Sequence, residues 1–390
     1  MPSRRITGRP ISGLKKDKIQ DIFNFIFDIF DLDGKSILER TKKSFYYITP
    51  GMYGAKGDGL VDDTVSMQLC INKSEELNLP IKLIGKYRIT STLKIGYFLT
   101  MFGCNIARDS YKFNNANSII ISETPTLFES KNDNKEASIY MKDLFIMDKY
   151  YYNSTEIILF NGILNKKSYF SNVTTLGFTK VFHGTLERCS IIEKCNFEGI
   201  KQNFISYGKS APTIVDCFIE KNYINGNPNM NCILFDLYVP SNSKILDNYI
   251  DFAKIAIDIT QQGAGVNVSR NTIDFCYRGI NGKINNMNIK DNNYVHITKN
   301  EIARFPNADD DMKNGDWWGI EVSKTGACNF NIIGNMNTKV DNFCKIDGYG
   351  YYNININSNN YDDSLINKVL YKNVISQMPH DGENINISQD

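Results

Sequence analysis

Acidic and amide side chains recur directly after a short apolar motif in the second half of this 390-residue chain. Two carboxyl groups held a few ångströms apart can hydrolyse a glycosidic bond, one protonating the leaving oxygen while the other acts as nucleophile or activates water. The motif occurs as Ala256-Ile257-Asp258, Gly279-Ile280-Asn281, Gly319-Ile320-Glu321 and Lys345-Ile346-Asp347, and a similar run ends at Asp236.

The separations within this column follow from the number of coils between its members, if the chain winds as a parallel β-solenoid. Neighbouring coils lie about 4.8 Å apart, so Asp236 and Asp258 come close to the roughly 5–5.5 Å of a retaining glycosidase. Asp258 and Glu321, two coils apart at roughly 9.6 Å, come near the upper end of the inverting range. We predict Asp258 and Glu321 as acid and base, with Asp236 as the substitute partner. A solvated polar face is the plain alternative.

A polar insertion at residues 303–318 precedes Glu321 and carries both tryptophans of the protein. Aromatic faces can pack against sugar rings, so Trp317 and Trp318 are predicted to form a sugar platform, with Asp316 and Asn281 as further substrate contacts. The acidic run at residues 309–311 is an alternative site. It lacks the spacing of an EF-hand, and no metal site is predicted.

Other candidates for chemistry are weaker. Asp251 and Asp274 follow isoleucines in turn-like positions and are interpreted as structural. His183-Gly184 stands alone and is attributed to chance. A lyase would need a base beside a uronic acid, and nothing singles out one of the available side chains: Arg270, Arg278, His296 and Arg304.

The composition of the second half predicts the solenoid that would align this column. Asparagine makes up 33 of the 190 residues after Ile200, too many for ordinary helix or sheet interiors. Asparagine tolerates left-handed turns and stacks in ladders between coils. A repeat with a 23-residue spacing supports this prediction. Its predicted asparagine column is Asn248, Asn271, Asn300 and Asn335, with Cys195 and Cys217 in two earlier coils.

Residues 46–95 carry a compact signature ahead of the solenoid. Gly54-Ala-Lys-Gly-Asp-Gly59 is followed by Asp62-Asp63-Thr64, an amphipathic stretch at 65–77, and Gly85-Lys-Tyr87-Arg-Ile89. These residues predict a Gly-rich turn, a helix capped near Asp62–Thr64 and a strand pair, so Asp58, Asp62 and Asp63 are interpreted as structural.

This signature strongly resembles the N-terminal cap of the pectate-lyase-like superfamily, which includes many phage tailspikes. The resemblance implies an all-β fold, a right-handed single-stranded parallel β-helix with a capping helix, covering residues 96–390 behind the cap. It also implies a protein that acts on or binds surface glycans, usually as a homotrimer. The polygalacturonase set of N-T-D, paired Asp, H-G and R-I-K motifs is not present as a set, which puts catalysis in doubt.

Composition and charge narrow the classes of partner. The formal net charge is +1, from 44 basic and 43 acidic residues, which gives no broad attraction to nucleic acid or membranes. Nine cysteines without C-x-x-C spacing are typical of buried thiols and predict neither disulfides nor a zinc site. No membrane-spanning stretch or signal peptide is evident.

Residues 1–45 form a separate segment with helical spacing of apolar residues at 17–30. This short helical segment is predicted to serve attachment or oligomerisation, for example to phage tail or baseplate proteins. The sequence thus predicts a phage tailspike-like depolymerase of a bacterial capsule, exopolysaccharide or O-antigen, located in the virion and needing no cofactor. The alternative is a non-catalytic receptor-binding or adaptor protein on the same scaffold.

Overall fold

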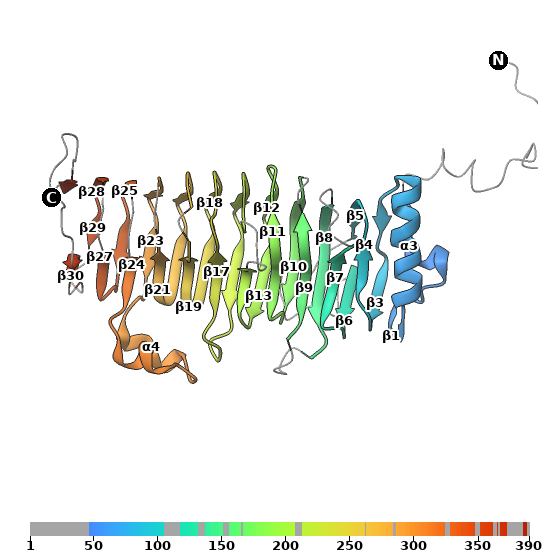
Figure 1. Cartoon of the computed structure of the whole chain (residues 1–390). Helices are drawn as coiled ribbons and strands as arrows, with labels where there is room; N and C mark the ends of the chain where they lie inside the picture. The colour runs from blue at the N-terminus through green and yellow to red at the C-terminus, as the bar shows by residue number, and fades with distance from the viewer. Residues whose placement is uncertain are drawn as a thin grey trace, which may run out of the picture. The chain divides into compact units, whose positions relative to one another are not determined.

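A computed structural model describes residues 47–104, 118–131, 137–150, 156–164, 167–206, 213–261, 263–283, 286–323, 328–347, 352–361, 365, 367–372 and 385–387. The predicted helix at residues 17–30, with the rest of the segment 1–45, lies outside the described residues. The described part is a parallel β-helix, as predicted, because its strands pair in parallel with strands of the coils before and after them (Figure 1).

Each coil contributes to three ladders of strands. The first ladder contains β2 (Ile81–Lys82), β5 (Phe98–Phe102), β12 (Ile191–Glu193), β15 (Phe218–Glu220), β18 (Lys244–Leu246), β20 (Asn267–Ser269), β22 (Asn288–Lys290), β25 (Cys328–Ile333), β28 (Tyr352–Asn357) and β31 (Ile385–Ile387). The second contains β1 (Asp58–Asp62), β3 (Gly85–Ile89), β6 (Ser118–Ser122), β13 (Asn196–Ile200), β16 (Tyr223–Gly226), β23 (Asn293–Val295), β26 (Met336–Thr338) and β29 (Asn360–Tyr361).

The third ladder holds the predicted catalytic column. It contains β4 (Leu93–Ile95), β7 (Thr126–Ser130), β9 (Ile158–Leu164), β11 (Lys180–Leu186), β14 (Asn203–Ser206), β17 (Ile233–Leu237), β24 (Trp318–Ser323), β27 (Asn342–Asp347) and β30 (Asn367–Lys372). Four long strands bend from one ladder into the next: β8 (Ser138–Asp148) and β10 (Tyr169–Leu176) join the first to the second, and β19 (Tyr249–Ile259) and β21 (Thr272–Gly282) join the second to the third.

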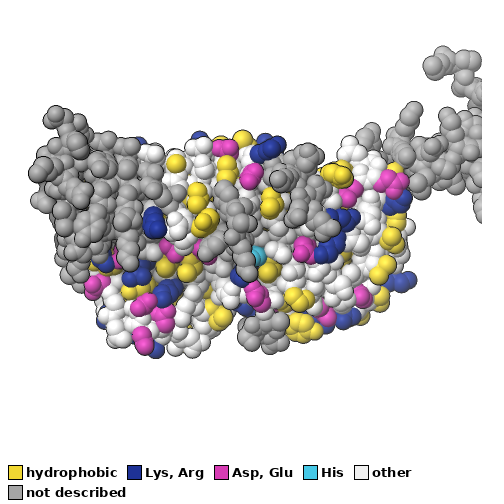
Figure 2. All heavy atoms as spheres, viewed as in Figure 1, with side chains coloured by type: hydrophobic (Ala, Val, Ile, Leu, Met, Phe, Trp, Pro, Cys, Tyr) yellow, Lys and Arg dark blue, Asp and Glu magenta, His cyan; other side chains and the backbone are white. Residues whose placement is uncertain are grey.

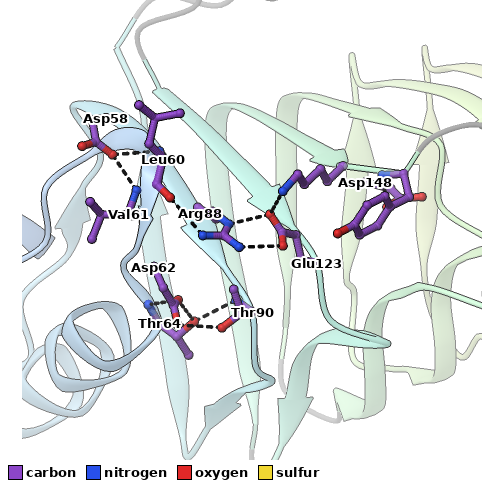
Figure 3. A network of polar contacts seen from close by, with 11 residues as sticks. Asp58, Leu60, Val61, Asp62, Thr64, Arg88, Thr90, Glu123 and Asp148 are labelled. Carbon is purple, nitrogen blue, oxygen red and sulfur yellow. Dashed lines mark hydrogen bonds and ion pairs between the residues drawn. The ribbon is translucent and has the colours of Figure 1, made fainter.

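A helix covers the N-terminal end of the described β-helix, as the sequence signature predicts. A short 3-10 helix, η2 (Pro50–Tyr53), precedes α3 (Thr64–Leu77), which packs on β2, β4 and β5. The carboxylate of Asp62 accepts hydrogen bonds from the Thr64 amide and hydroxyl and from Thr90, while Asp58 accepts from the amides of Leu60 and Val61 (Figure 3). These carboxylates hold turns, which agrees with their structural interpretation.

An ion pair continues this network into the first coils. Arg88 on β3 contacts both carboxylate oxygens of Glu123, at 2.6 and 3.0 Å, and donates to the carbonyl of Leu60 (Figure 3). Lys149 also contacts Glu123, at 2.5 Å. The cap is therefore tied to the coils that follow it by a charged network as well as by the buried face of α3.

Stacked asparagines line the corner between the first and second ladders. Each donates from its side-chain amide to the side-chain oxygen of the next, at 3.0–3.1 Å. The residue before each of the first four has a positive φ of 54–57°. The predicted asparagine ladder is therefore present, and it consists of Asn222, Asn248, Asn271, Asn292, Asn335 and Asn359.

Two positions of the predicted column are wrong. Asn300 lies in a 3-10 helix, η4 (Lys299–Arg304), and Asn292 occupies its place in the ladder. Cys195 does precede Asn222 in the column, since its amide donates to the Asn222 side chain. Cys217 lies elsewhere, because its amide bonds Ser243. Hydrogen bonding by the side-chain amide, rather than the letter pattern, decides which residue enters the ladder.

The interior is apolar throughout the described coils, and cysteines take part in it. Six of the eight cysteines whose side chains are described are buried, and all eight are free thiols. Burial raises the pKa of the Cys195 thiol to about 12, which keeps it protonated. Behind the third ladder, Phe182, Phe204 and Phe235 pack edge to face at 5.2 and 5.7 Å, a rigid support for the residues outside them.

The surface carries both signs of charge. Lys and Arg side chains alternate with Asp and Glu along the face drawn in Figure 2, rather than gathering in a region of one sign. Among the described residues no helix is long and apolar enough to span a membrane.

Candidate functional site

The predicted catalytic column forms one row on the outer side of the third ladder. Asp236 pairs with Asp258, Asp258 with Asn281, and Asn281 with Glu321 on successive strands β17, β19, β21 and β24. Their neighbours along each strand are buried in the core. The register predicted for these four residues is therefore confirmed.

The last member of the predicted column is wrong. Glu321 pairs with Lys345, and Asp347 pairs with Ser323, two residues further along the strands. The motif at Lys345-Ile346-Asp347 was aligned two residues out of register, because Cys344 and not Ile346 pairs with Ile320. A cation, rather than a carboxylate, thus follows Glu321 in the row.

The row also extends to earlier coils through residues that the sequence analysis discounted or missed. His183 pairs with Ser206, and Ser206 neighbours Asp236 because Ile205 pairs with Phe235 one position before. The His183 Nδ1 lies 2.8 Å from the Ser206 hydroxyl. Burial and Lys180 lower the pKa of His183, which favours the neutral imidazole. We call the whole set the polar row: His183, Ser206, Asp236, Asp258, Asn281, Glu321 and Lys345.

A sequence signal for this extension did exist. In each of these strands two apolar residues, which are buried, separate the polar residue that begins the strand from the residue of the polar row: Lys180 to His183, Asn203 to Ser206 and Ile233 to Asp236. Coil lengths here differ from the 23-residue repeat that was used to align the later coils, so the periodic search did not reach them.

Asp236 and Asp258 form a carboxyl pair at the spacing of one coil, about 4.8 Å between paired strands. Burial and the charge of Asp258 raise the pKa of Asp236 to about 6, and Lys180 opposes the shift. Burial also raises the pKa of Asp258, opposed by a hydrogen bond of 2.8 Å from Asn281 and by the charge of Arg278. Because only Asp258 has such a hydrogen bond to its carboxylate, it is the member that ionises first.

Glu321 lies in a different environment from this pair. Its carboxylate contacts two cations, the Arg278 Nε and the Lys345 Nζ, the second at 2.5 Å. Its side chain is 9% exposed, so the three groups form a largely enclosed ionic cluster. This environment suits the positioning of two cations better than proton transfer to a substrate.

The predicted tryptophan platform does not agree with the structure. Trp317 and Trp318 are 0% and 2% exposed, so neither offers a face to a sugar ring. Trp317 packs against Tyr277 and Phe305 and donates from its indole nitrogen to the Met312 carbonyl. The insertion needs a small core of its own, and the tryptophans supply it. Asp316, directly before them, is exposed.

The insertion folds back over earlier coils. It contains η4 and a short helix, α4 (Asp310–Asn314), which projects from one edge of the solenoid (Figure 1). Lys254 on β19 contacts Asp309 at 2.5 Å and Asp311 at 3.2 Å. Asn307 donates to the carbonyl of Asn229, which precedes β17. The insertion therefore lies beside the strands that carry Asp236 and Asp258.

The pair Asp251 and Asp274, on the second ladder, is more enclosed. Asp251 is 3% exposed and accepts hydrogen bonds from Tyr223 and Asn225, while Asp274 accepts from Tyr249. Burial raises the pKa of Asp251 to about 7. Their covered position agrees with a structural interpretation.

Three of the four possible lyase bases are engaged away from the polar row. Arg270 pairs with Asp247, Arg304 with Glu301, and His296 with Asp274. Arg278 alone adjoins the row. Among the side chains that the structure describes, no group of three or more His, Cys, Asp or Glu residues could hold a metal ion.

No protein-family model matches the sequence, and no curated protein is similar to it in sequence. Similar solved structures do exist. One is the catalytic unit of a thermostable GH87 α-1,3-glucanase from Streptomyces thermodiastaticus, with a TM-score of 0.55 and 13% identity over 85% of this chain and 69% of that one. Another is the Agl-KA catalytic domain, with a TM-score of 0.52 and 12% identity over 83% and 68%.

A third is a mutant tailspike of the E. coli bacteriophage HK620 in complex with a pentasaccharide, with a TM-score of 0.54 and 11% identity over 84% of this chain and 66% of that one. At these identities the likeness shows the fold. It is the fold that the N-terminal signature implies, a parallel β-helix of the pectate-lyase-like type.

Proposed function

We propose that this protein binds and hydrolyses a bacterial surface polysaccharide, with Asp236 as the general acid and Asp258 as the nucleophile. The observation that carries the proposal is a carboxyl pair one coil apart whose members differ in environment. Support also comes from the fold, which this chain shares with a glucanase catalytic unit and with a tailspike crystallised with a pentasaccharide. The class of substrate follows from the resemblance of the cap to phage tailspikes.

The chemistry balances with these two residues. Protonated Asp236 gives its proton to the glycosidic oxygen while the Asp258 carboxylate attacks the anomeric carbon and the bond to the leaving sugar breaks. The Asp236 carboxylate then takes a proton from water, and that water displaces Asp258 from the glycosyl ester. Asn281 orients the Asp258 carboxylate through its hydrogen bond. The one-coil spacing favours retention of configuration.

Product release from a panel of capsule, exopolysaccharide and O-antigen polysaccharides tests this function. New reducing ends without ultraviolet absorbance from an unsaturated sugar are the expected result. Reducing ends accompanied by that absorbance would identify a lyase and remove the carboxyl pair from the mechanism. Tight binding of a glycan that stays full length would instead support a receptor-binding protein without catalysis.

The pH dependence of cleavage should report the acid. Asp236 acts in its protonated form, so kcat/KM should fall as the pH rises through about 6, the pKa of this carboxyl. Lys180 holds that pKa down, so Lys180→Met should raise it and move the alkaline limb to higher pH. Lys221→Met, which removes an exposed lysine from a turn of another ladder, should leave the limb in place. A limb that stays fixed or moves to lower pH in Lys180→Met would contradict the assignment of Asp236.

We also propose that the protein acts in a phage tail, as a homotrimer, with residues 1–45 attaching it to tail or baseplate proteins. The N-terminal signature and the shared fold support this placement, since a tailspike is among the similar structures.

A further inference from the structure

Two cations share one carboxylate at the far end of the polar row. Arg278 on β21 and Lys345 on β27 both contact Glu321 on β24, which lies on the strand between them. The side chains of Arg278 and Lys345 are 23% and 18% exposed, and that of Glu321 is 9% exposed. The cluster is thus enclosed by protein on most sides but still open to a ligand.

The charges in this cluster do not balance. Two positive groups and one carboxylate leave a net charge of +1 in a site where water has limited access. Unpaired charge in such a site costs free energy unless an opposite charge approaches it. The nearest acidic groups beyond Glu321, on the insertion, are engaged with Lys254, and Asp311 is 70% exposed and screened by water.

The guanidinium of Arg278 also retains donors. Its contact with Glu321 is an ion pair through Nε that lacks the geometry of a hydrogen bond. Nη2 donates to the Tyr277 hydroxyl at 3.3 Å, and the guanidinium lies 4.5 Å from the centre of the Tyr277 ring. Arginine offers five N–H donors in a planar fork, which matches the two oxygens of a carboxylate.

The position of the cluster relates it to the carboxyl pair. Glu321 lies two coils beyond Asp258 in the same row, and Lys345 three coils beyond. A sugar unit with its linkage is about as long as the spacing of one coil, so a chain lying along the row would place successive sugars over successive coils.

We propose that the substrate is an acidic polysaccharide, and that Arg278 and Lys345 bind the carboxylate of a uronic-acid-type sugar two or three coils beyond Asp258. The location of the cleaved bond rests on the proposed function, whereas the recognition of an anionic group does not. Glu321 is a positioning residue here, since it holds the two cations side by side.

Binding is measured with the full chain carrying Asp258→Asn, so that cleavage does not consume the ligand. The probes are alginate, polygalacturonate, hyaluronan and acidic capsule polysaccharides, each compared with its own carboxyl-reduced form, which keeps the linkages and removes the charge. At least one acidic probe should bind, its affinity should fall about tenfold or more on carboxyl reduction, and it should fall further with added salt.

Variants place the effect at the cluster. Lys345→Met should lower affinity for the acidic probe about tenfold and leave affinity for its carboxyl-reduced form unchanged, while Lys345→Arg should retain binding. Lys142→Met, at an exposed lysine on β8, is the matched control. Equal affinity for the acidic and reduced forms, unchanged affinity in both Lys345→Met and Arg278→Gln, or failure of every acidic probe to bind would each overturn the inference.

The same experiment separates the two proposals. Charge-dependent binding without cleavage by the wild-type protein would remove the proposed hydrolysis and leave this inference standing. Cleavage of a neutral glycan, with no preference for an acidic one, would do the reverse.

Discussion

Replacement of Asp258 by asparagine is expected to lower kcat for polysaccharide cleavage by about three orders of magnitude or more, because Asn cannot attack the anomeric carbon. The side chain keeps its size, and Asn281 can still donate to its carbonyl oxygen, so the hydrogen bond of 2.8 Å has a replacement. The fold should therefore remain intact. Reducing ends released per unit time measure the loss, and circular dichroism checks the fold.

The substitution has a second consequence, on the pKa of Asp236. The charge of Asp258 helps to raise that pKa to about 6, so the residual activity of Asp258→Asn should lose its alkaline limb at a lower pH than the wild type. Burial still raises the pKa, so it should not return to the ordinary range.

A matched control makes the same chemical change elsewhere. Asp291 is exposed, lies outside the polar row, and has a φ of 54°, a conformation that asparagine adopts readily. Asp291→Asn should leave cleavage unchanged. If Asp258→Asn cleaves at the wild-type rate, the polar row is only a solvated face and the carboxyl pair is not catalytic.

The sequence was sufficient for the part of this site that depends on regular repetition. Asp258, Asn281 and Glu321 fall in one row because the short motif before each of them packs into the core in the same way, as the register confirms. The same reasoning failed at Asp347, where the alignment was two residues out. A two-residue error keeps every side chain on its own face of a strand, so the alternation of buried and exposed residues gives no warning of it.

Burial was the other point that residue types could not decide. Trp317 and Trp318 were predicted to be exposed because aromatic residues can pack against sugars, yet the same apolar area fills the core of the insertion. Which use is made depends on contacts with Tyr277 and Phe305, which lie 40 and 12 residues from Trp317 in the sequence. Lys345 was missed for a related reason, since its role depends on the pairing of β27 with β24.

The asparagine ladder should carry a large share of the stability of the coils, and Asn271 tests this. Its side chain is 1% exposed and makes four hydrogen bonds. It donates to the Ile245 carbonyl and to Asn292, and it accepts from the amide and the side chain of Asn248. Asn271→Ala leaves buried partners without a bond on both neighbouring coils. We expect a loss of about 3–5 kcal/mol in the free energy of unfolding, since each such buried group costs about 1–3 kcal/mol.

The effect should depend on the ladder and not on asparagine as a residue type. Asn267 on β20, half-buried in the same coil, makes one side-chain hydrogen bond, from Ser269. Asn267→Ala should therefore cost about 1 kcal/mol or less. The urea midpoint of unfolding compares the two variants, with the slope against urea as a check that both unfold from the same folded state. Equal midpoints for Asn271→Ala and Asn267→Ala would mean that apolar packing alone holds successive coils together. A large difference would mean that the amide stack also fixes the register between coils, and it is this register that places Asp236 beside Asp258.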